Sequence, residues 1–108
     1  MFFFFKVPDE RPPKLKAESF TSPTNLPITW ESYPVGVIPG VLTGYQLWYT
    51  PTARGDDDIE EGQRKTIQIA ADQRRVVLEN LEINTKYKIE LAARTKKGLG
   101  PSSFTFGG

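Results

Sequence analysis

Residues 76–95 constrain the fold more than any other stretch of this sequence, VVLENLEINTKYKIELAART. After a bend at residues 79–85, apolar and polar side chains alternate, and the apolar set is Tyr87, Ile89, Leu91 and Ala93. A period of two over this length predicts a β-strand with one buried face. A tyrosine directly after a bend, with Leu81 upstream, can bury its ring and return its hydroxyl to the loop backbone. The stretch therefore predicts a sheet protein with a corner locked by Tyr87.

The rest of the chain repeats this alternation in short segments separated by turn residues. We expect further strands at residues 15–20, 26–30, 44–50, 64–70, 74–78 and 103–106. In the sequence, no segment has a sustained helical period. Seven short strands of this kind predict an antiparallel β-sandwich. The expected core includes Trp30, Tyr45, Leu47, Leu81, Tyr87, Ile89 and Leu91, and either Phe104 or Phe106 is expected to pack inward.

Three connections and one proline are expected to depart from regular strand structure within this sandwich. Residues 32–43 hold five branched apolar side chains, so this loop either folds back on the core or presents a contact surface. Residues 51–62 are acidic and rich in turn formers, which predicts a solvated loop. Residues 96–101, KKGLGP, predict a turn-forming loop before the last strand. Pro27 removes a backbone donor, which predicts an irregular or edge-like start to its strand.

The composition excludes several classes of function. The chain has 108 residues, enough for one domain, and contains no cysteine and no histidine. The usual nucleophile and base pairs are therefore absent, and we expect no catalysis and no cofactor. A formal net charge of +1 gives no overall attraction to nucleic acid or to membranes. No apolar run in the sequence approaches the roughly 20 residues that span a bilayer.

The order of these residues resembles that of a fibronectin type III domain. The matching positions are Pro13, Leu15, Ile28, Trp30, Gly44, Tyr45, Leu47, Tyr49, Leu81, Thr85, Tyr87, Ala93, Thr95, Gly98, Gly100, Pro101 and Ser102. The resemblance covers about residues 12–106. It implies an immunoglobulin-like sandwich of seven strands, with sheets A-B-E and C′-C-F-G in the family's lettering. It also implies a non-catalytic module for protein contact or spacing.

The resemblance leaves three kinds of host protein open. We expect a cell-surface adhesion or signalling receptor or a matrix protein, with the domain outside the cell. Its partners would then be other proteins and the neighbouring domains of its own chain. The alternatives are a cytoplasmic structural module of a giant muscle or cytoskeletal protein, and an accessory domain of a secreted enzyme.

The two ends of the chain differ from the domain between them. Residues 1–11 open with Met1 and four consecutive phenylalanines, and we expect a tail, a linker or an artificial end. The alternative is that residues 2–5 pair with a sheet edge or drive association between chains. Gly107 and Gly108 are interpreted as the remnant of a linker.

Trp48 is the first candidate for a partner-binding residue. Alternation along residues 44–50 places it on the face opposite Tyr45 and Leu47, near Lys88, Glu90 and Arg94 of the neighbouring strand. The structural interpretation is that Arg94 or Lys88 stacks on the indole ring. The functional interpretation is a contact centre for a partner, because tryptophan and arginine are enriched at such centres.

Arg54, Gly55 and Asp56 form an RGD tripeptide in a connection predicted to be exposed. In adhesion proteins this triplet is read by integrins, with the arginine in an acidic pocket and the aspartate on a receptor metal. A three-residue motif also arises by chance. In the family's best-known integrin binder the triplet lies in the last hairpin, where this sequence has KKGLG. We therefore rank the triplet below Trp48.

Two further charged groups have weaker functional interpretations. The acidic group, which offers oxygen ligands for calcium but lacks the spacing and glycine of an EF-hand loop, is Asp56, Asp57, Asp58, Glu60 and Glu61. The basic group, which alternation scatters over both sheets, is Arg64, Lys65, Arg74, Arg75, Lys96 and Lys97. We expect solvated surfaces in both cases rather than a metal site or a heparin-like site. The sequence also lacks an Asn-x-Ser/Thr glycosylation signal.

Overall fold

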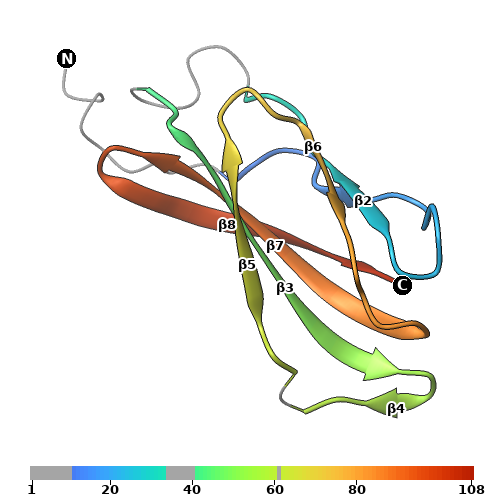
Figure 1. The fold of residues 1–108 in the computed structure, drawn as a ribbon. Helices are drawn as coiled ribbons and strands as arrows, with labels where there is room; N and C mark the ends of the chain where they lie inside the picture. Colours follow the sequence, from blue (N-terminus) through green and yellow to red (C-terminus); the bar gives the residue numbers. More distant parts are fainter. Residues whose placement is uncertain (1–10, 34–40, 61) are drawn as a thin grey trace.

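The computed structural model describes residues 11–33, 41–60 and 62–108, and these residues form eight β-strands. The strands make two antiparallel sheets that enclose one core, which confirms the predicted β-sandwich (Figure 1). The strand beyond the predicted seven is β4, which has two residues. Within the described ranges, no helix is long and apolar enough to cross a membrane.

The smaller sheet has three strands in the order β1-β2-β6. They are β1 (Lys16–Ala17), β2 (Leu26–Thr29) and β6 (Arg75–Leu78). This arrangement matches the A-B-E sheet that the resemblance implies.

Pro27 lies in the central strand of this sheet, opposite Val77 of β6. Its carbonyl accepts a hydrogen bond of 2.9 Å from the backbone N–H of Glu18. The N and O of one strand residue point to the same side, so the missing donor also faces the β1 side. Because β1 ends at Ala17, the strand behaves there like an edge, and the proline removes no hydrogen bond to β6.

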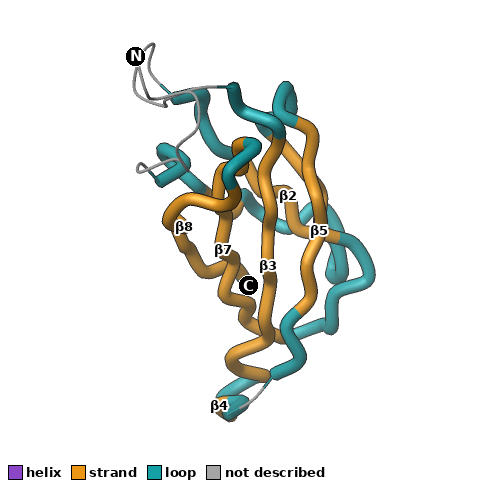
Figure 2. Tube along the Cα trace, turned by 90° about the vertical axis from the view of Figure 1, so that its left-hand side faces the viewer, coloured by secondary structure: helices purple, strands orange, loops and turns teal. Residues whose placement is uncertain are grey.

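The larger sheet has five strands, and Figure 2 shows β8, β7, β3 and β5 side by side. The strands are β3 (Gly44–Arg54), β4 (Asp57–Asp58), β5 (Lys65–Ala70), β7 (Thr85–Thr95) and β8 (Gly98–Gly107). β3 pairs with β7 on one side and with β5 and β4 on the other. This order matches the implied C′-C-F-G sheet, with β4 added to the end of β3.

The core lies between the two sheets and contains the seven residues expected there from the other strands and the corner. Trp30, Tyr45, Leu47, Leu81, Tyr87, Ile89 and Leu91 are all buried. The indole of Trp30 meets the ring of Tyr45 edge to face, with 5.3 Å between the ring centroids. Leu15, Ala17 and Phe20 pack against this core from the first strand and from the residues on either side of it.

The corner before β7 is locked as the sequence predicts. The hydroxyl of Tyr87 accepts a hydrogen bond of 2.8 Å from the backbone N–H of Glu82. Leu81 and Tyr87 are each only 4% exposed, so the hydroxyl reaches the loop while the ring stays in the core. Asn80 and Asn84 take positive φ angles of 57° and 55°, which asparagine tolerates better than most residues and which lets the chain turn twice.

The prediction that residues 51–62 form only a solvated loop is wrong for their first part. β3 continues through Pro51 to Arg54, because β7 offers it a partner along that length. A bulge between Pro51 and Ala53 inserts Thr52 as an extra residue, and this irregularity admits the proline. Similarly, the connection predicted at residues 96–101 is a turn of two residues only, since β8 already begins at Gly98.

The prediction that Phe104 or Phe106 packs inward is also wrong, because the two side chains are 61% and 50% exposed. The inner positions of β8 hold small residues instead. Ser103 Oγ donates a hydrogen bond of 2.5 Å to the carbonyl of Pro12. Gly107 is the last residue of β8, and a Cβ built on it would lie 2.6 Å from Leu26 Cδ2 and 3.0 Å from Ala17 Cβ. Gly107 is therefore part of the packed sheet, although its sequence suggests a linker.

Two expectations fall largely outside the described residues. The interpretations of residues 1–10, including the four phenylalanines, concern positions outside the described residues. Of the apolar loop at residues 32–43, positions 34–40 lie outside the description. At its described ends, Tyr33 and Leu42 pack against the core, whereas Val41 is 69% exposed.

Candidate protein-binding face

The face of the larger sheet that points away from the core carries the best candidate site. β3 turns Tyr45 and Leu47 into the core, so Gln46 and Trp48 lie on the outer face. Trp48 is directly opposite Glu90 of β7 and Thr66 of β5. Glu90 is in turn opposite Phe104 of β8. One row across four strands therefore joins β5 to β8 through Trp48.

Arg64, which precedes β5, stacks on the half-buried indole of Trp48. Its guanidinium carbon lies 4.7 Å from the ring centroid, and its Nη2 lies 3.9 Å from Glu90 Oε1. A cation over the face of a tryptophan ring is attracted by the ring quadrupole. The same guanidinium is also attracted to the carboxylate of Glu90. The expectation that Arg94 or Lys88 stacks on Trp48 is therefore wrong.

Lys88 contacts the phenylalanines of β8 instead. Its Nζ lies 5.0 Å from the ring centroid of Phe104. Phe104 and Phe106 meet edge to face, with centroids 6.0 Å apart and an interplanar angle of 87°. We refer to the side chains that continue from Trp48 to the free edge of β8 as the Trp48 cluster: Trp48, Arg64, Lys88, Glu90, Phe104 and Phe106.

Arg94 is on the same face but outside the Trp48 cluster. It is four residues from Glu90 along β7, which corresponds to about 13 Å. Its Nη2 donates a hydrogen bond of 2.5 Å to Gln46 Oε1. Its backbone carbonyl accepts a bond of 2.8 Å from the N–H of Thr43. The structure thus places Glu90 directly opposite Trp48, as predicted, puts Lys88 against Phe104, and fixes Arg94 at the end of the sheet.

Sequence reasoning missed Arg64, Phe104 and Phe106 as members of this surface. A signal for the phenylalanines was available, because residues 104 and 106 share one parity and must face the same way. Ser103, Thr105 and Gly107 are small enough to face a narrow part of the core, and this favours the phenylalanines outside. No comparable signal identifies Arg64, since its contact depends on the register between β5 and β3.

The RGD triplet lies at the tip of the hairpin between β3 and β4. Arg54 pairs with Asp57 in the ladder, so Gly55 and Asp56 form a two-residue turn. Gly55 has a φ of 58°, and a positive φ at the first turn position matches a type II′ hairpin. All three residues are exposed, as predicted.

Two contacts hold this hairpin against the loop that precedes β7. Arg54 Nη2 donates to, and is ion-paired with, Glu82 Oε2. The N–H of Gly55 donates a bond of 2.8 Å to the carbonyl of Asn84. The triplet is therefore anchored to the corner at residues 82–84, and its arginine already has an acidic partner.

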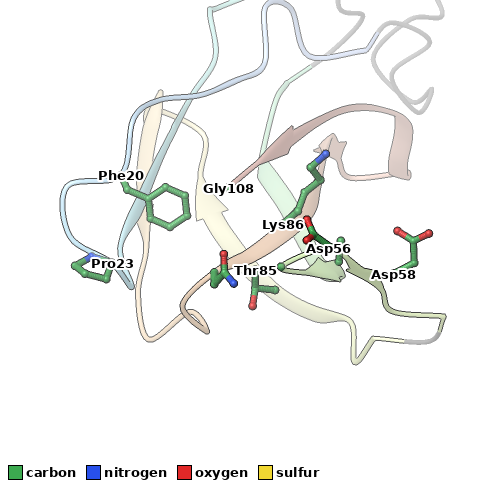
Figure 3. Close-up of a pocket in the computed structure, with 10 residues that line it drawn as sticks. Phe20, Pro23, Asp56, Asp58, Thr85, Lys86 and Gly108 are labelled. Atoms are coloured by element: carbon green, nitrogen blue, oxygen red, sulfur yellow. The ribbon is translucent and has the colours of Figure 1, made fainter.

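A hollow of about 460 Å³ lies beside this hairpin. Figure 3 shows Phe20 and Pro23 on one side of it, and Asp56 and Lys86 on another. Its lining combines apolar and charged groups, without a set of side chains that converges on one point. Gly108, the last residue of the chain, also lines it.

The acidic group and the basic group do not come together on the surface as the Trp48 cluster does. Within the described part of the chain, no group of three or more acidic side chains is placed to hold a metal ion, and Glu61 lies outside that part. In the basic group, Lys65 is in β5 and Arg75 is in β6, hence in different sheets. Arg74 is fixed by Ser32 Oγ and by two carbonyls of the adjacent turn.

Comparisons with known proteins agree with this architecture. The model of the fibronectin type III domain family matches residues 10–106. The tyrosine-protein phosphatase Lar of Drosophila melanogaster is 39% identical over 89 residues, which are 82% of this chain and 4% of Lar. The chain thus corresponds to a small part of that relative.

Solved structures show the same fold at lower identity. The third fibronectin III domain of human KIAA0343 superposes with a TM-score of 0.80 and 21% identity, covering 95% of this chain and 83% of that one. The FN1-FN3 domains of chicken CNTN1 give a TM-score of 0.75 and 24% identity, covering 93% of this chain and 32% of that one. The chain belongs to the fibronectin type III family.

Proposed function

We propose that this chain is a non-catalytic module that binds a protein partner through the Trp48 cluster. The observation that carries this proposal is the row of Trp48, Glu90 and Phe104 across three neighbouring strands. It places aromatic rings at two points of a rigid sheet, and rigid aromatic side chains lose little conformational entropy on binding.

The charges around the rings support a protein partner. Arg64 and Lys88 are cations that each lie against an aromatic ring, and Glu90 lies between them. Interface centres are enriched in tryptophan and arginine, and a surrounding set of polar groups supplies orientation. Since Glu90 partly balances the two cations, the surface favours a contact of mixed charge over one driven by charge alone.

We further propose that the module belongs to a cell-surface receptor and faces the outside of the cell. The matched phosphatase is far longer than this chain, which supports a host that carries many domains. The catalytic activity named for that relative would then reside elsewhere in the host. The absence of histidine and cysteine supports a non-catalytic role for this part.

A cell-binding assay tests the proposed surface. The purified chain would be biotinylated, assembled on streptavidin to gain avidity, and applied to a panel of cultured cells. Cells that bind the wild type would then be exposed to Trp48→Ala and Lys88→Glu. Glu79→Gln is the matched control, because Glu79 is exposed at the corner and away from the cluster.

The proposal predicts that both cluster variants lose most of the binding while the control keeps it. Each variant must retain the thermal transition of the wild type, so that misfolding is excluded as a cause. Equal binding by the wild type and Trp48→Ala on every responsive cell line would refute the proposed surface.

A further inference from the structure

β8 is the edge strand of the larger sheet, and its two halves differ in how the free edge is protected. In the first half, Pro101 lacks a backbone donor, and Arg11 Nε donates a hydrogen bond of 2.9 Å to the carbonyl of Ser102. In the second half, the sequence Phe104-Thr105-Phe106 has no proline, no charge and no register shift. Exposed edges without such features are open to pairing with another strand.

The direction of the backbone groups follows from the contact with Arg11. Because Arg11 approaches from outside the sheet, the carbonyl of Ser102 points away from β7. Backbone groups alternate along a strand, so those of Phe104 and Phe106 also point to the free edge. Among the described residues, no backbone hydrogen bond to these two positions is found on that side. The same two residues carry rings that are 61% and 50% exposed.

We propose that a second copy of this chain pairs with this edge, β8 against β8 in antiparallel orientation, about a two-fold axis at Thr105. A two-fold contact uses one patch twice, so it requires a patch that complements itself. With the axis at Thr105, each Phe104 faces Phe106 of the partner subunit. Both positions direct their N–H and C=O groups outward, so each such pair can exchange two hydrogen bonds.

The contact with Arg11 selects this register over its neighbours. An axis at Phe104 would place Phe106 of one copy opposite Ser102 of the other. The carbonyl of Ser102 already accepts a hydrogen bond from Arg11. An axis at Phe106 would place Phe104 of one copy opposite residue 108 of the other, which lies beyond the end of β8. The axis at Thr105 is thus the register that uses both open positions of the edge.

The side chains are also compatible across the proposed seam. Lys88 is opposite Phe106 and Glu90 is opposite Phe104 within one chain. In the pair of chains, each row runs from Glu90 through the two phenylalanines to Lys88 of the second copy. No two like charges then meet directly, and aromatic pairs across antiparallel strands are favourable.

This inference goes beyond the binding function proposed above and does not depend on it. The seam would add strands to the sheet at its edge. It shares Phe104 and Phe106 with the Trp48 cluster, whereas Trp48 itself lies two strands away. Only about four backbone hydrogen bonds and four rings would be involved, so we expect a weak dimer with a dissociation constant on the order of 10⁻⁴ M.

Sedimentation equilibrium of the full chain, from about 10 µM to 1 mM to bracket that value, tests the proposal. The wild type should shift from monomer to dimer across this range. Phe104→Pro removes a backbone N–H that points away from β7, and Phe106→Lys adds a charge at the edge. Both variants should remain monomeric and should keep the thermal transition of the wild type. Ile83→Ser is the control, because it removes an apolar side chain that is 63% exposed but belongs to the loop before β7 and not to the edge at residues 104–106. It should dimerise like the wild type.

Two further measurements distinguish pairing of β8 with a second copy from association through residues 1–5. Amide exchange of Phe104 and Phe106 should slow with rising protein concentration, because only strand pairing protects these N–H groups. A chain lacking residues 1–5 should dimerise as before. A wild type that stays monomeric, a dimer that survives both edge variants, or a dimer lost with residues 1–5 would each overturn the proposal.

Discussion

The hydroxyl of Tyr87 accepts a hydrogen bond of 2.8 Å from the backbone N–H of Glu82, and this bond ties the corner to the core. It is one of the contacts through which the larger sheet holds the loop that carries Glu82 and Asn84. The same two residues anchor the RGD hairpin. The corner therefore affects both the stability of the sandwich and the position of a surface loop.

Replacing Tyr87 with phenylalanine keeps the buried ring and removes only this bond. We expect a loss of about 0.5–1.5 kcal/mol in the free energy of unfolding, since the N–H of exposed Glu82 can turn to water. Urea denaturation measures it. No change in midpoint would mean that the bond does not stabilise the corner.

Tyr45 differs from Tyr87 because removing its hydroxyl should not destabilise the domain. Its ring is fully buried, and its hydroxyl has no hydrogen-bond partner among the described residues. Removing an unsatisfied buried hydroxyl removes a desolvation penalty, so Tyr45→Phe should leave the free energy of unfolding unchanged or raise it by up to about 1–3 kcal/mol. The same urea titration compares the two variants. A clear loss of stability would reveal an ordered partner of that hydroxyl.

Gly107 should not tolerate a side chain. A Cβ at this position would lie 2.6 Å from Leu26 Cδ2, and Leu26 is fully buried and cannot move aside freely. We expect Gly107→Ala to destabilise the domain by about 1–3 kcal/mol, as overpacking does. Thermal denaturation should show a lower midpoint. A midpoint equal to that of the wild type would show that the end of β8 does not pack as described.

The RGD triplet should not support integrin binding in this setting. Arg54 is ion-paired with Glu82, and two further aspartates follow Asp56. A soluble-integrin adhesion assay should give equal signals for the wild type and Asp56→Ala. Adhesion by the wild type alone would show that the pair opens readily, as exposed ion pairs can.

Alternation in the sequence predicts most of the sandwich, because a period of two identifies both the strand and its buried face. Tyr87, Ile89 and Leu91 are buried as expected, and the two sheets contain the expected strands. The local sequence pattern does not predict how far a strand extends when another strand pairs with it. β3 extends to Arg54 because β7 continues beside it, and neither the bulge nor this pairing is encoded in residues 51–54 alone.

The candidate site was predicted in part for the same reason. Strand parity identifies Trp48 as an outer residue, since it depends only on the alternation within β3. The neighbours of Trp48 depend on the register between strands. Glu90 stands directly opposite it, Arg64 covers its ring, and Arg94 is bound to Gln46 farther along β7.

The central claim is that β3 has one face that builds the core and another that lies outside it. The unfolding free energies of Trp30→Ala and Trp48→Ala test it most directly. Trp30 is 3% exposed, and its truncation should cost about 3–5 kcal/mol. Trp48 is half-buried on the outer face, so Trp48→Ala should lose the contact with Arg64, about 0.5–1 kcal/mol, together with part of its packing on the sheet, and keep a cooperative transition. A loss for Trp48→Ala as large as that for Trp30→Ala would contradict the claim.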